Sequence, residues 1–295
     1  MKPAPFDYVR PSALDEALGV LAADEDARPI AGGQSLLPLL NLRLARPTTL
    51  IDLRDLGLDR IDVGSGELRI GASVTHRRLE LDPAIRAVPL LADAAAHVGS
   101  PAIRNRGTLG GSLAHADPAA ELPSVAVALG ATIVLQSIAG QRLVSAGTFF
   151  DGFWTTAIEP GELLVEVRFP VAGARHGAAF CEVAPRADDF ATAGVGVAVD
   201  VDERGSLVRV RAGGCGLAST PVDLGPALAP VVGRRVDDDV LHEVAASVEA
   251  SVEPSDDRVA TADERRTLAG LLAARALAQA ADRASGPIAT SAVPA

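Results

Sequence analysis

Apolar residues recur at helical spacing along much of the chain. Leu14, Leu18 and Leu21 fall on one face of a helix that is predicted to begin after Ser12. Ser12 and Asp15 stand at the spacing of a capping box, which favours a helix start at this point. The same periodicity predicts further helices from residue 75 onward and over residues 89–98, 119–129, 239–250 and 262–284.

Shorter apolar runs with turn residues at their ends predict β-strands. These runs are residues 28–31, 49–53, 67–71, 131–136, 141–145, 162–169, 192–202 and 206–215. Ala139-Gly140 and Glu203-Arg204-Gly205 each separate two such runs and therefore predict two hairpins.

One uncharged stretch, residues 122–141, is long enough to suggest a membrane span. Pro123, Gly130 and Gly140, together with several polar side chains, interrupt it. A short helix followed by a core strand explains the stretch better than a transmembrane helix. We therefore expect a protein that is not integral to a membrane.

The order of the elements predicts an α+β fold in three pieces. We expect a first lobe over residues 1–58, a second lobe over residues 59–174 and a C-terminal domain over residues 175–285. Residues 286–295 are rich in Gly, Pro, Ala and Ser and are predicted to form a disordered tail.

Composition removes several classes of partner and metal site. The net charge of −11 and the aromatic content of 3% argue against a nucleic-acid partner. The first residues lack the apolar run of a signal peptide, and the isolated Cys181 and Cys215 fit a reducing compartment, so we expect a cytoplasmic protein. Two cysteines and five scattered histidines provide neither an iron–sulfur cluster nor a structural zinc site, so no metal site is expected.

The usual means of binding phosphate are missing as well. Lys2 is the only lysine in the sequence, so a P-loop is absent and a lysine Schiff base for pyridoxal phosphate is improbable. The sequence also has no G-x-G-x-x-G between a strand and a helix, which removes a Rossmann dinucleotide site. If this protein binds a dinucleotide, main-chain amides and hydroxyl groups must do it.

Two segments with paired glycines could provide such amides. They are Ala31-Gly32-Gly33-Gln34-Ser35-Leu36 and Thr108-Leu109-Gly110-Gly111-Ser112. Glycine pairs permit positive φ, and successive N–H groups that point into one concavity form an anion-binding nest. Two nests suit a pyrophosphate that carries large rings on both sides, as in FAD, although glycine pairs more often only turn the chain.

The second segment stands in a longer motif, which begins at Ile103-Arg104-Asn105-Arg106 and continues to Pro123. With both segments in this order, the chain closely resembles the FAD-binding medium subunits of the molybdenum hydroxylases. The flavoprotein subunit of aerobic carbon monoxide dehydrogenase is the most similar branch, and the xanthine dehydrogenase family carries the same module. The resemblance covers most of the chain, including Asp52-Leu53-Arg54 and Glu159-Pro160-Gly161-Glu162.

The resemblance implies a two-lobed, PCMH-type FAD-binding domain, followed by a small C-terminal α+β domain with a short antiparallel sheet and helices. It implies that residues 31–36 and 108–112 wrap the pyrophosphate and ribityl chain. Asp117 and Glu121 would accept hydrogen bonds from ribose or ribityl hydroxyls. Leu164 would pack near the isoalloxazine, and Asp189 and Phe190 would lie at its edge.

Two of these residues, and the neighbouring His115, have alternative interpretations. Asp117 precedes a proline and could simply initiate a turn, and Phe190 could be a core aromatic residue. His115 could be a loop residue that shapes the second glycine segment without acting as an acid or base. Cys181 and Pro185 replace a lysine and an arginine found in relatives, so the flavin potential and the electron acceptor stay open.

By resemblance, this chain is an FAD-carrying electron-transfer subunit with no catalytic side chain of its own. Its expected partners are a large molybdenum-cofactor subunit and a small subunit with two [2Fe-2S] clusters, in a dimer of heterotrimers. A stand-alone FAD-dependent oxidoreductase and a flavin-free assembly subunit are the alternatives. The substrate (carbon monoxide, an N-heterocycle, a purine or an aldehyde) depends on the large subunit.

Overall fold

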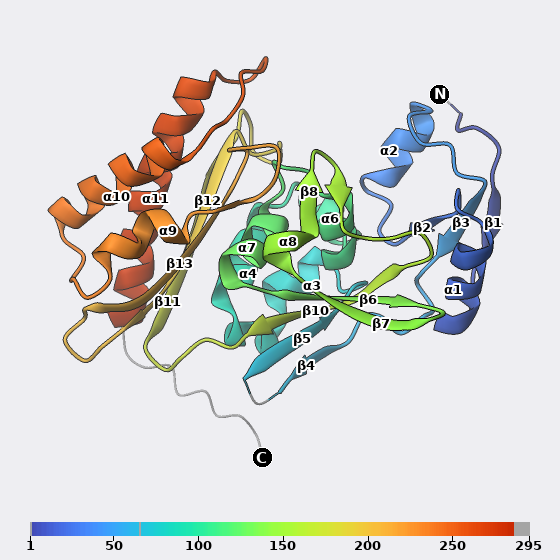
Figure 1. Cartoon of the computed structure of the whole chain (residues 1–295), viewed down its shortest axis with the longest axis horizontal. Helices are drawn as coiled ribbons and strands as arrows, with labels where there is room; N and C mark the ends of the chain where they lie inside the picture. The colour runs from blue at the N-terminus through green and yellow to red at the C-terminus, as the bar shows by residue number, and fades with distance from the viewer. Residues whose placement is uncertain (1, 65, 286–295) are drawn as a thin grey trace.

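The computed structural model describes residues 2–64 and 66–285, and the predicted tail at 286–295 lies outside them. Figure 1 shows three sheets in a row, with helices between and around them. The predicted α+β class is confirmed. In the described part of the chain, none of the helices has the length and apolar character needed to cross a bilayer.

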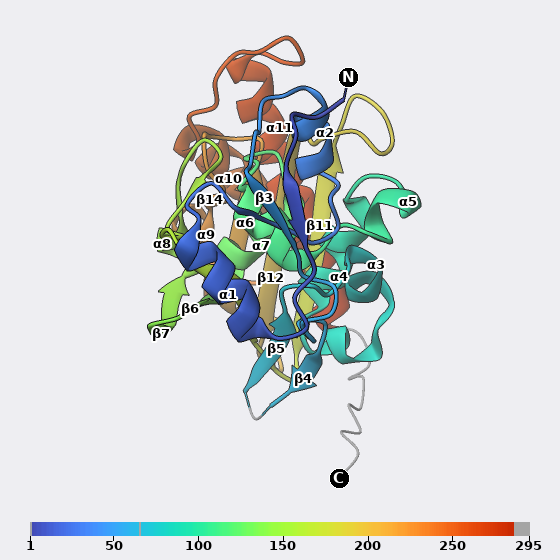
Figure 2. The same cartoon turned by 90° about the vertical axis from the view of Figure 1, so that its right-hand side faces the viewer.

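The N-terminal sheet is small and parallel, with strand order β1-β3-β2. Its elements are β1 (Asp7–Val9), α1 (Leu14–Ala23), β2 (Arg28–Ile30), α2 (Leu36–Asn41) and β3 (Thr49–Asp52). Helix α1 covers the sheet with Ala17, Leu18 and Leu21 buried (Figure 2). The capping box predicted at Ser12 is wrong, because the N-cap is Ala13 and the Ser12 amide donates to the Glu16 carboxylate at 3.0 Å.

The second sheet is antiparallel and has five strands in the order β4-β5-β10-β6-β7. The strands are β4 (Ile61–Val63), β5 (Glu67–Gly71), β6 (Thr132–Ser137), β7 (Gly140–Ser145) and β10 (Leu163–Pro170). The helices of this part are α3 (His76–Leu81), η1 (Pro83–Ala87), α4 (Pro89–His97), α5 (Pro101–Arg104), α6 (Leu109–His115), α7 (Glu121–Leu129) and α8 (Ala146–Phe149). The uncharged stretch is α7 followed by β6, as predicted.

A short hairpin, β8 (Phe150–Gly152) and β9 (Thr155–Thr156), projects beside α6 (Figure 1). At its tip, Phe153 and Trp154 are both exposed. His115 stacks on Trp154 with ring centroids 6.2 Å apart, so the hairpin is attached to the end of α6.

The C-terminal sheet is antiparallel, in the order β11-β12-β13-β14. Its strands are β11 (His176–Val183), β12 (Ala193–Val201), β13 (Leu207–Cys215) and β14 (Val222–Asp223), and the helices that follow are α9 (Gly225–Leu228), η2 (Ala229–Val231), α10 (Asp238–Ser251) and α11 (Ala262–Ser285). Helix α11 packs on one face of β11 and β12, while α4 and α7 pack on the other (Figure 1). A capping box starts α11, because the Thr261 amide donates to the Glu264 carboxylate at 2.7 Å and the Glu264 amide donates to the Thr261 hydroxyl at 3.2 Å.

Candidate functional site

The two glycine-containing segments lie side by side. The first glycine loop (residues 31–36) joins β2 to α2, and the second glycine segment (residues 108–112) starts α6. A Cβ atom added to Gly32 would lie 2.0 Å from the carbonyl oxygen of Arg106, just before the second segment. The Arg106 guanidinium also donates to the Gly32 carbonyl oxygen at 3.4 Å. The sequence motif therefore marks two chain segments that meet in space.

The first glycine loop has open main-chain amides. Gly33 has a φ of 73°, and its carbonyl oxygen accepts from the Leu37 amide at 3.0 Å. Among the described residues, none accepts a hydrogen bond from the main-chain N–H groups of residues 33–36. A row of unused amides after a left-handed glycine has the geometry of an anion-binding nest. These residues fit the pyrophosphate of a dinucleotide.

The second glycine segment is different, and the expectation of a second open nest is wrong. Thr108 caps α6, so its hydroxyl accepts from the Gly111 amide at 3.1 Å and its carbonyl from the Ser112 amide at 2.9 Å. The amides of Leu109 and Gly110 donate to main-chain carbonyls near β5, each at 2.9 Å. The segment can therefore offer a ligand the exposed surface of Gly111 and the hydroxyl of Ser112.

Gly110 is glycine for a packing reason. A Cβ atom at this position would lie 2.5 Å from the Cβ of Ala72, and Gly110 is buried. The absence of a side chain lets α6 approach the end of β5, and Gly110 does not face open space.

A buried histidine supports this segment from below and was not predicted as a site residue. His76 is 5% exposed, and its Nε2 lies 3.0 Å from the Thr108 carbonyl oxygen. Burial lowers the pKa of His76 to about 4, so the ring is neutral and Nε2–H donates to that carbonyl. Its position in sequence, at the start of a capped helix, carried no sign of this contact.

Two of the predicted acidic residues occupy different environments. Asp117 accepts from the Ala119 amide at 2.9 Å, so it does initiate a turn before α7. Glu121 is 6% exposed in the first turn of α7. Burial, together with the charge of Asp117, raises the pKa of Glu121 to about 7.

A third carboxyl group, Glu182 on β11, lies near Glu121 and was missed as a site residue. One of its carboxylate oxygens is buried and has no hydrogen-bond partner among the described residues. Burial and the nearby charge of Glu121 raise the pKa of Glu182 to about 8. Because the two carboxyl groups come from α7 and β11, they mark the junction between the second and third sheets.

The remaining predicted residues are divided between core and surface. Leu164 is 4% exposed on β10 and belongs to the core cluster. Phe190 is 67% exposed and Asp189 is exposed as well, in the segment that joins β11 to β12. The alternative interpretation of Phe190 as a core aromatic residue is therefore wrong, and the ring is free to contact a ligand.

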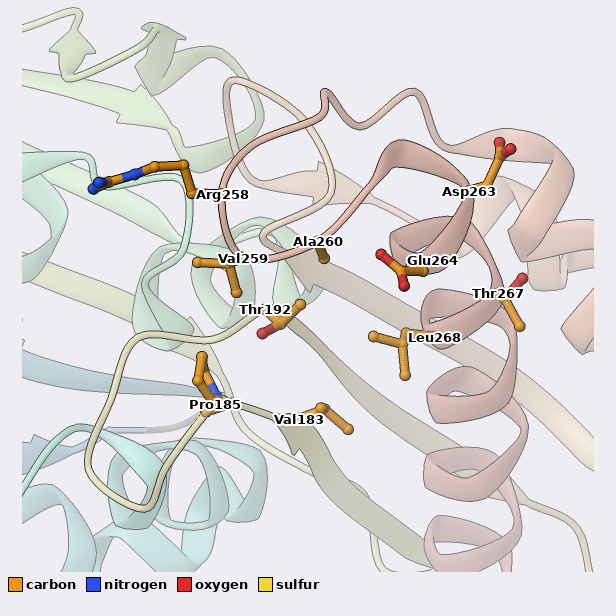
Figure 3. A pocket seen from close by; sticks show the side chains of 11 residues that line it. Val183, Pro185, Thr192, Arg258, Val259, Ala260, Asp263, Glu264, Thr267 and Leu268 are labelled. Carbon is orange, nitrogen blue, oxygen red and sulfur yellow. The ribbon is translucent and has the colours of Figure 1, made fainter.

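The same segment borders a groove of about 850 Å³ (Figure 3). One wall is the end of β11 with Pro185 and Thr192, and the other is the loop before α11 with the first turns of that helix. Its lining contains none of the predicted FAD-binding residues. The groove is thus a feature of the C-terminal sheet and separate from the meeting point of the glycine segments.

Two family profiles cover nearly the whole chain. The FAD binding domain in molybdopterin dehydrogenase matches residues 4–172, and the CO dehydrogenase flavoprotein C-terminal domain matches residues 178–280. The chain is 38% identical to the caffeine dehydrogenase subunit beta of Pseudomonas sp. (strain CBB1), over 96% of this chain and 97% of that one. It is 36% identical to the carbon monoxide dehydrogenase medium chain of Afipia carboxidovorans, over 96% and 99%.

A solved structure agrees with these sequence matches. A chain of quinoline 2-oxidoreductase from Pseudomonas putida 86 superposes with a TM-score of 0.92 at 40% identity, over 96% of this chain and 99% of that one. The fold, the meeting of the two glycine segments and these matches agree with the resemblance seen in the sequence. The chain belongs to the FAD-binding subunits of the molybdenum hydroxylases, the family that includes the carbon monoxide dehydrogenase medium chains.

Proposed function

We propose that this chain is the electron-transfer subunit of a heterotrimeric molybdenum hydroxylase. FAD, when bound, accepts electrons from [2Fe-2S] clusters on a partner and passes them to an external acceptor. The observation that carries the proposal is the contact of Gly32 with Arg106, which brings the two glycine segments of an FAD-binding family together. The protein contributes binding, orientation and exclusion of water, with no catalytic side chain of its own.

The geometry supports a division of roles among the candidate FAD-binding residues. The open amides of residues 33–36, next to Ala31 and Gly32, would donate to the pyrophosphate in charge-assisted hydrogen bonds. The second glycine segment would line the opposite side with Gly111 and the Ser112 hydroxyl, while Leu109 and Gly110 support it from the interior.

The remaining roles concern the sugar and the flavin ring. Asp117 and Glu121 would hydrogen-bond ribose or ribityl hydroxyls, Asp117 from the turn before α7 and Glu121 from the first turn of that helix. Asp189 and Phe190 would lie at the edge of the isoalloxazine, with Leu164 packed behind it. The exposure of Phe190 supports this role, since an exposed ring has apolar surface to bury on a ligand.

The partners follow from the relatives and from what this chain lacks. The relatives are named as a subunit beta and a medium chain, which supports an assembly with other polypeptides. Cys181 and Cys215 are both buried, so iron–sulfur clusters would belong to a small partner subunit and the molybdenum cofactor to a large one. We propose a cytoplasmic dimer of heterotrimers, in which this chain has lobes over residues 1–58 and 59–174 and a domain over residues 175–285.

Titration of the purified chain with FAD tests the proposal. We expect a yellow protein that binds one FAD and turns over no substrate alone, and a native complex that contains two further polypeptides, one rich in cysteine. A chain that stays colourless even when refolded with FAD would support the flavin-free assembly subunit. A chain that oxidises a small substrate unaided would support the stand-alone oxidoreductase. The chain is similar in sequence both to a relative named for caffeine and to one named for carbon monoxide, which supports a substrate that is set by the large subunit.

A further inference from the structure

A buried arginine on α11 connects three separate segments of the C-terminal part. Arg265 is 6% exposed. One guanidinium nitrogen, Nη1, donates to the main-chain carbonyl oxygens of Thr192 and of Gly216, the latter at 3.0 Å. The other, Nη2, donates to the Asp257 carboxylate at 2.6 Å. A single side chain therefore joins the β11–β12 connection, the turn after β13 and the loop before α11.

Two of these segments lead directly to candidate FAD-binding residues. The Thr192 amide donates to the Val183 carbonyl oxygen at 2.8 Å, which closes the segment that carries Asp189 and Phe190. The Gly216 amide donates to the Pro118 carbonyl oxygen at 2.7 Å, next to Asp117. Arg265 thus holds two carbonyls at one end of the C-terminal sheet, and the Gly216 amide connects this end to the segment before α7.

Asp257, the carboxylate that binds Arg265, is itself held in place by main-chain amides. The Asp257 carboxylate accepts from the amides of Val259 and Ala260 at 2.8 and 3.0 Å. These bonds and Arg265 lower the pKa of Asp257 to about 2, so the carboxylate stays charged. The planar guanidinium fork can serve three acceptors at fixed angles, whereas a lysine ammonium is a point charge on a flexible stem.

We propose that Arg265 is a positioning residue for the FAD site, which sets the place of the Phe190 segment relative to Asp117. The inference rests on the proposed FAD-binding function. Arg265 itself would not contact FAD; it acts through the carbonyl oxygens of Thr192 and Gly216. Loss of the fork would leave the buried carbonyl of Thr192 and the half-buried carbonyl of Gly216 without this donor and would let the segment move away from the flavin.

Hydrogen exchange of the FAD-free full chain tests the tie itself. In Arg265→Lys we expect faster amide exchange in residues 184–192 and 216–218 than in the wild type. Arg266→Gln is the matched control, because Arg266 is the next residue on α11 and, within residues 2–64 and 66–285, pairs only with Asp263, an exposed side chain. Unchanged exchange in Arg265→Lys would overturn the proposal. Asp257→Asn, which removes the anchoring charge, is the second variant if the lysine variant does not fold.

FAD affinity tests the consequence. We expect Arg265→Lys to bind FAD about tenfold more weakly, the effect of losing roughly one charge-assisted hydrogen bond, and Arg266→Gln to bind it unchanged. In a double-mutant cycle with Phe190→Ala, the two losses should be less than multiplicative, because both variants remove the same contact. Multiplicative losses would mean that Arg265 only supports the fold and would overturn the positioning role. If the wild type bound no FAD while the exchange changed as expected, the proposed function would fail and the structural tie would stand.

Discussion

Gly32 and Arg106 are in main-chain contact, although 74 positions separate them in the sequence. The space for a Cβ atom at Gly32 is filled by the Arg106 carbonyl group, and the Cα of Gly107 would lie only 2.9 Å from it. The close approach requires a residue without a side chain in the first glycine loop. This single contact fixes the separation between the open amides of residues 33–36 and the start of α6.

Gly32→Ala should therefore push the two segments apart. The added methyl group meets main-chain atoms, which cannot move as a side chain would, so we expect a loss of about 1–3 kcal/mol in the free energy of unfolding and weaker FAD binding. Thermal melts of the FAD-free chain and FAD titration measure the two effects. Gly19→Ala is the control, because a Cβ atom on this α1 residue meets nothing within 4 Å. The control should gain about 0.5–1 kcal/mol. Equal melting temperatures and flavin contents for both variants would contradict the role of the contact.

Gly110→Val and Gly33→Val should both lose flavin, for different reasons. At Gly110 the new side chain collides with Ala72 beneath α6, so the FAD-free chain should also melt at a clearly lower temperature. At Gly33 the cost comes from a φ of 73°, about 1–2 kcal/mol for a residue with a side chain, and the nearest atom is the movable Cδ1 of Leu37 at 3.0 Å. If both variants kept stoichiometric FAD, the assignment of these segments to the flavin site would be wrong.

Phe190→Ala should separate ligand binding from folding. Because the ring is 67% exposed, its removal should change the free energy of unfolding of the FAD-free chain by less than about 0.5 kcal/mol. If the ring packs on the flavin, FAD affinity should fall clearly in the same variant, and titration monitored by flavin fluorescence can measure it. Val208→Ala is the comparison, since Val208 is similarly exposed on β13, away from the candidate site. An equal affinity of the two variants would remove Phe190 from the site.

Sequence patterns found most of the elements and missed those that depend on tertiary packing. The hairpin of β12 and β13 was predicted because apolar runs flank a Glu203-Arg204-Gly205 turn. Strand β11, which lies between β10 and β12 in the sequence, was missed because Gly177, Ala178 and Ala179 give it little intrinsic strand propensity. It forms because helices cover both of its faces. Helix α6, with two adjacent glycines, was missed for a similar reason and depends on its Thr108 cap.

The candidate site shows the same limit. The family motif identified the two glycine segments, and the structure brings them together at Gly32. Whether an amide is free depends on which carbonyl lies opposite, and the partner of Gly110 is Ala72, a residue outside the motif. The proximity of Glu182 to Glu121 likewise depends on how β11 packs against α7. Distances between segments far apart in sequence leave no trace in local periodicity.

The two neighbouring carboxyl groups give the stability of the FAD-free chain a defined pH dependence. In the folded protein the pKa of Glu182 is about 8, well above its ordinary value of 4.5, and that of Glu121, about 7, is shifted in the same direction. Between pH 4.5 and about 8 the folded chain binds more protons than the unfolded chain, so the free energy of unfolding falls as the pH rises. The shift of Glu182 contributes fully below its ordinary pKa and is lost as the pH passes through about 8.

Glu182→Gln removes this titration and one of the two like charges. We expect the variant and the wild type to melt at similar temperatures near pH 4.5, the ordinary pKa of a glutamate. The variant should become increasingly more stable than the wild type as the pH rises from there to about 8, and the difference should level off above that pH. Glu203→Gln is the matched control, because its side chain is 90% exposed, and its melting curve should follow the wild type at every pH. Melting temperatures measured across this range decide the matter. A constant difference between Glu182→Gln and the wild type would mean that Glu182 is already ionised at neutral pH, and that the junction between α7 and β11 is open to water.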